Sequence, residues 1–182
     1  MELYNYSSYS YFGHLCEVPK DVLNNLHSYY DKLQAVEPTQ NLGHYKQWHV
    51  QTSKLLREDI DTTWSHWTDE DYLKPTKDFF LQFVNSMFKF RFSFLQKDRV
   101  VDYHAKHMLP RIHIPLNDSG SVFVVKDDND VEHEYNMEYG HAHFINVTLL
   151  HKVVATKNVD RKNTFFCLAS FADQKIKEKF LK

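Results

Sequence analysis

The histidines of this chain are concentrated in its second half, among residues that favour β-strands. The 182-residue chain holds 12 histidines, and seven of them lie from His104 to His151. Imidazole is the commonest protein ligand of first-row transition metals. An arginine and a lysine stand in the same stretch, which adds positive charge to the candidate ligands. These residue types favour a combined metal and anion site.

Spacing places several of these side chains on common faces. If residues 102–116 form strands, residues two apart share a face. His104 then shares a face with Lys106, and Arg111 shares one with His113. An ordinary core strand would carry apolar residues at such positions, so the pattern predicts a functional face.

A second stretch carries the other half of the predicted site. His151 follows His104 by 47 positions and stands among apolar residues, and Arg161 follows ten residues later. A buried guanidinium needs an anion, and a carboxylate accepts its planar fork through two hydrogen bonds. An arginine beneath two metal-binding histidines would therefore hold a dicarboxylate.

The bulk composition excludes several classes of protein. Lysine and arginine number 22 against 24 acidic residues, so no strongly basic surface predicts a nucleic-acid partner. Two cysteines make neither a disulfide framework nor a zinc ribbon, and they favour a reducing compartment. We see no signal peptide at the N-terminus and no apolar run of membrane-spanning length. The sequence thus predicts a cytoplasmic protein, and it gives no oligomeric state.

Hydrophobic periodicity predicts a helical first part and a β-rich second part. Apolar residues recur at helical spacing in 20–33 and again in about 71–87, whereas 88–94 alternates as a strand with one buried face. Further strands are predicted at 100–104, 111–116, 121–125, 131–135, 141–146, 149–156 and 163–171, and a short helix at 172–182. We therefore predict a single domain: a mostly helical layer in residues 1–87, a β core in 88–171 and a C-terminal helix in 172–182.

Many short strands at regular spacing indicate a β-barrel or a double-sheet jelly roll. Three motifs narrow this choice: Arg111-Ile-His-Ile-Pro-Leu116, Gly140-His-Ala-His-Phe-Ile-Asn146, and His151-Lys-Val with Arg161 ten residues on. Together they resemble the aspartyl/asparaginyl β-hydroxylase family, whose pattern runs Arg-x-His-Ile-Pro-Leu, Gly-Glu-x-x-x-x-Asn and His-x-Val. The resemblance covers residues 100–171 and leaves the first hundred residues unmatched.

The resemblance implies a mainly β protein: a double-stranded β-helix, cupin-like and flanked by helices, that binds Fe(II) and 2-oxoglutarate and activates dioxygen. It implies that His104 and His151 are the iron ligands. Arg161 is expected to hold the distal carboxylate of 2-oxoglutarate. Arg111 and His113 are expected to make further cofactor contacts.

Two positions depart from the family pattern. His141 stands where the family more often has glutamate. Lys106 stands where many relatives have the aspartate that serves as third ligand, although the aspartyl/asparaginyl enzyme itself resembles a two-histidine site. An ammonium has no lone pair to offer a cation. Lys106 could point outward and leave water in the third position, sit neutral near the metal, or have abolished iron binding.

Other histidines have alternative readings. His107 competes with His104 as a ligand, but it lies closer to Arg111 than the family's ligand usually does. His133 is expected to pack in a hairpin. His141 and His143 share a face and could form a second metal site, although surface histidines are the simpler interpretation.

The functional prediction is an Fe(II)- and 2-oxoglutarate-dependent dioxygenase, a hydroxylase of an amino acid, an aspartyl or asparaginyl side chain or a related small molecule. The alternative is a cupin-like binding module that keeps the fold and has lost iron chemistry, as Lys106 suggests. A third possibility is that another ligand in the vacant position redirects the reaction. The substrate pocket is expected to include Tyr103 or one of the tryptophans, Trp48, Trp64 or Trp67.

Overall fold

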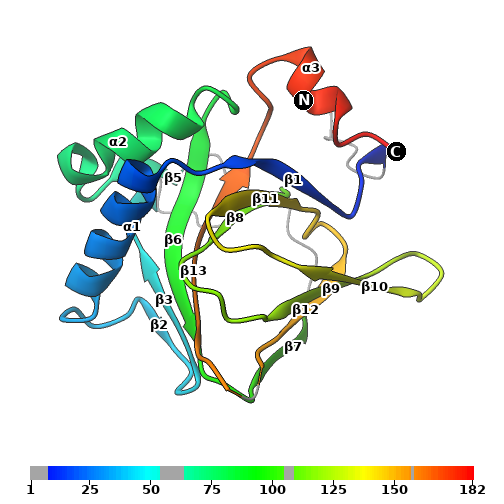
Figure 1. The fold of residues 1–182 in the computed structure, drawn as a ribbon, viewed down its shortest axis with the longest axis horizontal. Helices are drawn as coiled ribbons and strands as arrows, with labels where there is room; N and C mark the ends of the chain where they lie inside the picture. Colours follow the sequence, from blue (N-terminus) through cyan, green and yellow to red (C-terminus); the bar gives the residue numbers. More distant parts are fainter. Residues whose placement is uncertain (1–7, 54–63, 105–108, 157) are drawn as a thin grey trace.

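A computed structural model describes residues 8–53, 64–104, 109–156 and 158–182. Two β-sheets face each other, and two helices cover the outer side of the larger one (Figure 1). The strands are β1 (Phe12–Glu17), β2 (Gln40–Asn41), β3 (Tyr45–His49), β4 (Gln51–Ser53), β5 (Trp64–Trp67), β6 (Met87–Leu95), β7 (Val100–His104), β8 (Arg111–Pro115), β9 (Val122–Lys126), β10 (Glu132–Asn136), β11 (His141–Ile145), β12 (Leu150–Val154) and β13 (Arg161–Leu168). The helices are α1 (Lys20–Leu33), α2 (Glu70–Phe80) and α3 (Gln174–Glu178).

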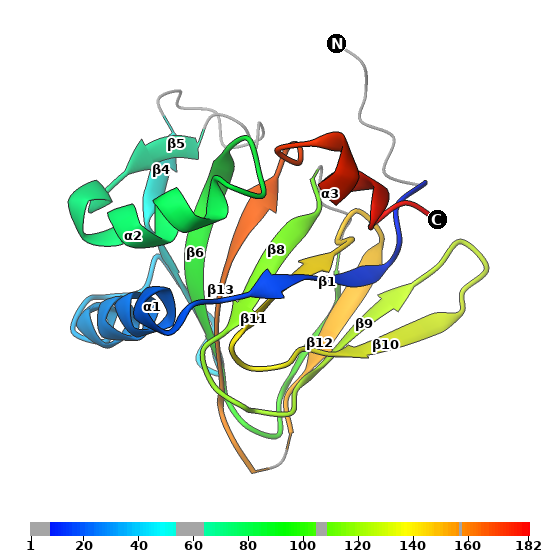
Figure 2. The ribbon, with the colours of Figure 1, turned by 45° about the horizontal axis from the view of Figure 1, so that its top comes forward.

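The larger sheet, here called the major sheet, has the order β1-β11-β8-β13-β6-β3-β2. The minor sheet has the order β10-β9-β12-β7, and β4 pairs with β5 separately. All these pairings are antiparallel, and apart from the β9–β10 hairpin the consecutive strands from β6 to β13 alternate between the two facing sheets. This arrangement is the predicted double-stranded β-helix. Figure 2 shows the two sheets facing each other.

The helices bury their apolar stripes against the outer face of the major sheet. In α1 the buried positions recur every three to four residues, from Val22 to Leu33, as the sequence predicts. They pack with outward residues of the major sheet, including Phe92, Ile112 and Phe166, each fully buried. This outer core covers one face of the major sheet. The polar and titratable side chains of the major sheet can therefore lie on its other, inner face.

Strand β6 shows how the alternation of the sequence is used. Phe90 and Phe92 face the helices, as expected for one buried face. Ser93, on the opposite face, is also buried, with only 1% of its surface exposed. Ser93 therefore faces the space between the two sheets, and not solvent.

A second, smaller core lies between the sheets. Leu95 and Ile145 of the major sheet pack there with Phe123, Val125 and Val153 of the minor sheet. By alternation, Phe123 and Val125 define the inner side of β9, and the register places His151 beside Val125 on the same side. The polar residues of the inner faces thus surround this apolar centre.

Several predicted boundaries are wrong. The described part of the predicted helical layer in 1–87 is not mostly helical, because β1 to β5 lie among the two helices and β1, β2 and β3 extend the major sheet. The second helix ends at Phe80, so Val84 forms a bridge with Phe171 and Met87 already begins β6. The C-terminal helix spans only Gln174–Glu178. The single-domain organisation stays a prediction.

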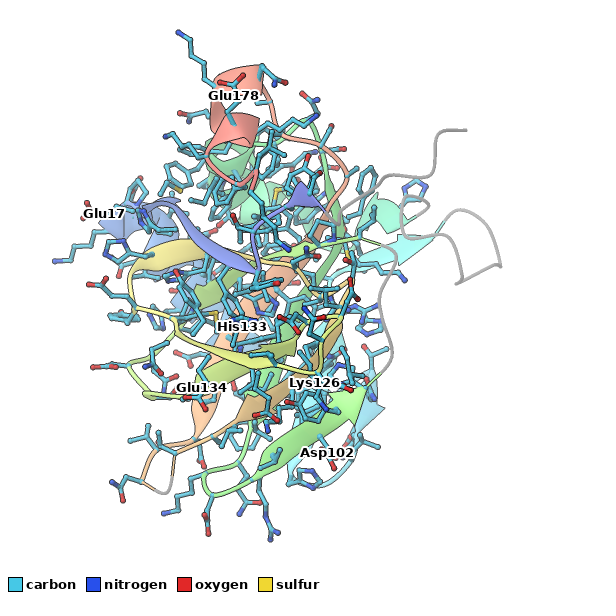
Figure 3. The ribbon with its side chains drawn as sticks, turned by 90° about the vertical axis from the view of Figure 1, so that its right-hand side faces the viewer. Glu17, Asp102, Lys126, His133, Glu134 and Glu178 are labelled. Carbon is cyan, nitrogen blue, oxygen red and sulfur yellow. The ribbon has the colours of Figure 1, made fainter. Side chains whose placement is uncertain are left out.

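The predicted hairpin around residues 127–130 is confirmed as β9–β10. His133 lies on β10, where its Nε2 is 2.9 Å from the Asp127 carboxylate. Figure 3 looks onto this side of the molecule and labels His133, Glu134 and Lys126 on the two strands. No helix among the described residues is long and apolar enough to cross a membrane.

Candidate active site between the two sheets

His104 and His151, 47 residues apart in sequence, are direct cross-strand neighbours on β7 and β12. Their ring centroids are 4.1 Å apart and the rings meet edge to face. His151 is buried, with 1% of its surface exposed, whereas His104 is half-buried. The structure therefore brings the two predicted metal ligands together at the inner side of the minor sheet.

Both rings are held in the same tautomer by the backbone. The Nδ1 atom of His104 is 2.9 Å from the carbonyl oxygen of Asp102, and Nδ1 of His151 is 2.9 Å from that of Leu149. A carbonyl only accepts, so each Nδ1 carries the proton and each Nε2 carries a lone pair. Metal-binding histidines are oriented in this way by an outer hydrogen bond.

His113 faces this pair from the major sheet with the opposite polarity. Its ring lies between Phe165, stacked at 5.0 Å, and Phe123, at 5.2 Å, and Phe123 also stacks on His151 at 5.5 Å. Asn163 Nδ2 lies 3.1 Å from His113 Nδ1 and donates to it. The proton of His113 therefore sits on Nε2, which has no hydrogen-bond partner among the described residues. His113 thus presents a donor, which suits an anion.

Arg161 provides a buried positive charge at the start of β13. Only 4% of its surface is exposed, and its Nη2 atom has no hydrogen-bond partner among the described residues. Burial lowers the pKa of Arg161 to about 10, so the guanidinium is still charged at neutral pH. Tyr45, which faces the same region, opposes this shift. A buried charge of this kind is costly unless an anion accompanies it.

Arg111 is the second buried guanidinium of the inner face. Its Cζ atom lies 4.7 Å above the ring centroid of Phe165, and its Nε has no hydrogen-bond partner among the described residues. Its charge contributes to lowering the pKa values of both His113 and His151. Arg111 therefore lies near the predicted metal pair as well as near the anion-binding face.

Among the residues that the structure describes, none of the buried side chains of this interior is acidic. Within the described residues, the buried polar side chains include two arginines and three histidines but no aspartate or glutamate. The same part of the chain contains no group of three or more histidine, cysteine or acidic side chains placed to hold a metal. Lys106 and His107, the position of the expected third ligand and the competing histidine, lie outside the described residues. The described metal donors are thus the imidazoles of His104 and His151, and the charged groups beside them are the guanidinium groups of Arg111 and Arg161.

Burial keeps the interior histidines neutral. Desolvation and then the neighbouring Arg161 and Arg111 charges hold the pKa of His113 well below its ordinary value. Desolvation and the nearby His104 lower the pKa of His151 to about 3. Neutral imidazole is the form that binds a metal, so these shifts favour the proposed ligand state.

These shifts predict acid sensitivity of the metal-free protein. Between the ordinary histidine pKa near 6.5 and the lowered folded values, the unfolded chain binds protons that the folded chain does not. The free energy of unfolding is therefore fully retained above about pH 7 and falls as the pH drops. The slope is about 1.4 kcal/mol per pH unit for each such histidine.

Urea denaturation from pH 7.5 to 5.0, with a chelator present, measures this slope. His113→Phe keeps an aromatic ring between Phe123 and Phe165, and it is expected to reduce the slope by about one proton's worth, about 1.4 kcal/mol per pH unit. His66→Phe, at an exposed position on β5, is the control that should keep the wild-type slope. An unchanged slope in His113→Phe would remove His113 from the acid-sensitive group.

Asn163 stands two residues after Arg161 on β13 and was not among the predicted site residues. The structure shows it fully buried, orienting His113 while its own Oδ1 has no hydrogen-bond partner among the described residues. The two-residue spacing from Arg161 was the available signal. Tyr45 was missed because no strand was predicted where β3 lies.

Two residues suggested for the substrate pocket face elsewhere. Trp48 packs on the outer face of the major sheet, where its ring lies 6.0 Å from that of Tyr30. Tyr103 alternates with the inward His104, and its ring lies under the Nζ atoms of Lys152, at 4.6 Å, and Lys126, at 5.7 Å. Neither side chain is placed to line the space between the sheets.

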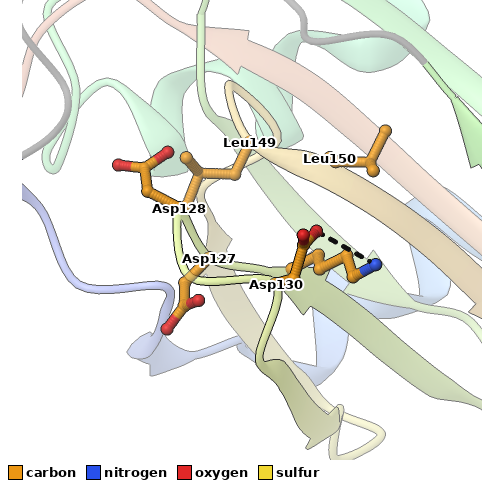
Figure 4. Close-up of a pocket in the computed structure, with 6 residues that line it drawn as sticks. Asp127, Asp128, Asp130, Leu149 and Leu150 are labelled. Atoms are coloured by element: carbon orange, nitrogen blue, oxygen red, sulfur yellow. Dashed lines mark ion pairs between the residues drawn. The ribbon is translucent and has the colours of Figure 1, made fainter.

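A hollow on the minor sheet is separate from this interior. Lys126, Asp127, Asp128, Asp130, Leu149 and Leu150 line it (Figure 4). Lys126 and Leu150 alternate with the inward Val125 and His151, so the hollow lies on the outer side of the strands. An ion pair between Lys126 Nζ and Asp130 Oδ1, at 3.1 Å, neutralises part of its acidic rim.

Comparison with known proteins places the fold. No family model and no curated protein matches the sequence. A 2OG-Fe(II) oxygenase family oxidoreductase from Burkholderia pseudomallei matches the structure with a TM-score of 0.56 and 12% identity, covering 85% of this chain and 94% of that one. A prolyl-4-hydroxylase from Pseudomonas putida gives 0.54 and 13%, covering 91% and 96%. HygX from Streptomyces hygroscopicus, solved with nickel and 2-oxoglutarate bound, gives 0.56 and 10%, covering 90% and 84%. The chain therefore has the fold of the 2OG-Fe(II) oxygenases.

Proposed function

We propose that this protein is an Fe(II)- and 2-oxoglutarate-dependent dioxygenase. The observation that carries the proposal is the polarity of the three inward histidines. Backbone carbonyls hold the proton of His104 and His151 on Nδ1, whereas His113 carries its proton on Nε2 beside two buried guanidinium groups. Such a site suits a cation next to an anion, which is how a metal with a chelating carboxylate cofactor binds.

The residues divide into metal-binding and cofactor-binding groups. His104 and His151 would hold Fe(II), and solvent or cofactor would occupy the other positions. Arg161, charged and buried, would pair with the distal carboxylate of 2-oxoglutarate through its planar fork. Arg111 and the His113 N–H would make the contacts nearer the metal. When bound, the iron and cofactor activate dioxygen, giving succinate, CO₂ and a hydroxylated product.

The protein itself orients the metal-binding and cofactor-binding side chains and excludes water from the site. The backbone bonds at Nδ1 fix both metal-binding rings, and the edge-to-face contact with Phe123 and the stacked Phe165 hold His113 in place. The apolar residues between the sheets exclude water from one side of the site. Rigid, partly dehydrated surroundings of this kind favour reaction with the bound substrate over reaction with solvent.

We infer that the substrate is an amino acid, an aspartyl or asparaginyl side chain or a related small molecule. The resemblance of Arg111-Ile-His-Ile-Pro-Leu116 and the neighbouring motifs to the aspartyl/asparaginyl β-hydroxylase pattern supports this choice. The two buried arginines, with no buried carboxylate among the described residues, support a partner that carries negative charge. Dioxygen is the co-substrate.

The test is 2-oxoglutarate turnover after anaerobic loading with Fe(II). Addition of oxygen is expected to produce succinate and CO₂ in equal amounts, slowly without substrate and faster with a peptide or amino acid that fits. Omitting Fe(II) or adding a chelator should abolish the reaction. Succinate is quantified by mass spectrometry.

The binding-module alternative makes a different prediction. Such a protein would bind 2-oxoglutarate or a metal in calorimetry and yet form no succinate under these conditions. Absence of any calorimetric signal from Fe(II), Zn²⁺ or 2-oxoglutarate would contradict both the enzyme and the binding module at this site.

A further inference from the structure

A second group of histidines lies where the edge strand β1 pairs with β11. His14 stands opposite His143 and Glu17 stands opposite His141 in the β1–β11 register. The ring centroids of His14 and His141 are 4.9 Å apart, and that of His143 lies 6.0 Å from the first and 6.4 Å from the second. The proposed function uses none of these side chains.

His14 and His141 already point nitrogen atoms at each other. His14 Nε2 and His141 Nδ1 are 2.9 Å apart. Two imidazole nitrogens that bind one zinc ion, each about 2.0–2.1 Å from it, lie about 2.9 Å apart at a right angle and roughly 3.3 Å apart at the tetrahedral angle. The observed separation is therefore what a bis-histidine site needs.

The far nitrogen of His141 has the partner expected of a metal ligand. Its Nε2 lies 3.6 Å from the Glu138 carboxylate. A carboxylate on the outer nitrogen holds a ligating imidazole in orientation and makes it a stronger donor. Its negative charge favours the tautomer with the proton on Nε2, in which the Nδ1 lone pair faces His14.

His143 closes the inner side of the pair without competing for the ion. Both of its nitrogens are already in hydrogen bonds, Nδ1 at 3.0 Å from the Tyr135 hydroxyl and Nε2 at 3.0 Å from the Glu138 carbonyl oxygen. The outer side is open, because His14 is exposed and a quarter of the His141 side chain is accessible.

We propose that His14 Nε2 and His141 Nδ1 bind a divalent transition-metal ion such as Zn²⁺, with Glu138 holding His141 from its far side. This is a two-ligand site, which accords with the lack of a preformed three-ligand group among the described residues. Solvent is available for the remaining positions, because His14 is exposed. Binding requires only that the proton on His14 Nε2 moves to Nδ1 through solvent.

An ion bound by His14 and His141 would join the edge strand β1 to β11, and we call this proposed site the metal staple. β1 is the terminal strand of the major sheet, and its pairing with β11 has an irregularity between His14 and Cys16. An edge strand is among the elements that open most easily. An ion that binds only the folded chain stabilises it by mass action, so Zn²⁺ should protect β1.

The experiment counts Zn²⁺ by calorimetry without 2-oxoglutarate. The wild-type chain is expected to bind two equivalents, one between the sheets and one at His14–His141. His14→Gln and His141→Gln should each bind one, and His151→Ala should also bind one. His66→Gln, at an exposed position on β5, should bind two.

The two sites can fail separately. A single equivalent that survives His14→Gln and disappears in His151→Ala would overturn the staple while leaving the proposed function standing. A single equivalent with the reverse behaviour would support the staple and contradict the metal site between the sheets. Wild-type binding in both His14→Gln and His141→Gln overturns the proposal.

Glu138→Gln provides a variant that cannot be dismissed as unfolded. Three-quarters of this side chain is exposed, so the change should leave the fold intact. Loss of the outer carboxylate is expected to weaken the second equivalent about tenfold. In the His151→Ala background, Zn²⁺ should raise the melting temperature, and that increase should vanish in the His14→Gln/His151→Ala double variant. Unchanged affinity in Glu138→Gln would overturn the assigned role of Glu138.

Discussion

Replacing His151 with alanine is expected to reduce the turnover of 2-oxoglutarate by more than about a hundredfold. Loss of an outer partner of a metal ligand typically costs 10- to 100-fold, and His151 is assigned as a ligand itself. His104 alone would be left at the inner side of the minor sheet, and one imidazole does not hold Fe(II) in place against solvent. Succinate formation after anaerobic iron loading measures the effect.

The control must separate loss of chemistry from loss of fold. His151 is buried against His104 and Phe123, so its truncation also leaves a cavity and is expected to lower stability by about 2–4 kcal/mol. His104→Ala, at a half-buried position, tests the same ligand pair at smaller structural cost. His66→Ala is the histidine control. Wild-type turnover in folded His151→Ala would contradict the assignment of this metal site.

Arg161→Met is expected to have opposite effects on cofactor binding and on stability. Truncating one partner of a buried, hydrogen-bonded charge pair costs about 2–5 kcal/mol. The KM for 2-oxoglutarate should therefore increase by a factor between about 30 and several thousand. Without cofactor, the buried guanidinium has no carboxylate partner among the described residues. Its replacement by an apolar side chain should therefore leave the free energy of unfolding unchanged or raise it by about 1–3 kcal/mol.

Two measurements test this combination. Urea denaturation without ligand gives the stability, and the shift of melting temperature with added 2-oxoglutarate gives the binding. Lys162→Met is the matched control, because its side chain alternates to the opposite face of β13 and lies over the Tyr30 ring. A marked loss of stability in cofactor-free Arg161→Met would mean that Arg161 has a structural partner and would contradict its role as the anion clamp.

The order and type of the elements could be predicted where periodicity was strong. The helix at Lys20–Leu33 and the strands of the β core follow the expected pattern, because each must bury one stripe or one face. The short strands before β6 were harder to predict from the sequence. β3 is a short strand with buried residues on both faces, so the alternation that marks a half-exposed strand is lost.

The motifs predicted which residues would form the site, and the structure brings them together. His104 and His151 meet because β7 and β12 pair in register, and the Arg161 side chain shares the inner face of β13 with Asn163 and Phe165. That they bind iron and 2-oxoglutarate stays a prediction. The role of Lys106 also stays open, since it lies outside the described residues.

What the sequence determined by itself was local: which residues alternate, which are titratable, and which lie two apart on one strand. Only the tertiary structure decided which inner-face residues of separate strands face each other, because strand pairing depends on contacts between residues far apart in the chain. The same holds for protonation. His104 and His113 are the same residue type, and the sequence does not distinguish their tautomers. In the fold, the Asp102 carbonyl keeps the proton of His104 on Nδ1, whereas the Asn163 amide keeps the proton of His113 on Nε2. The pairing of His14 with His141, 127 residues apart, is likewise a product of the fold.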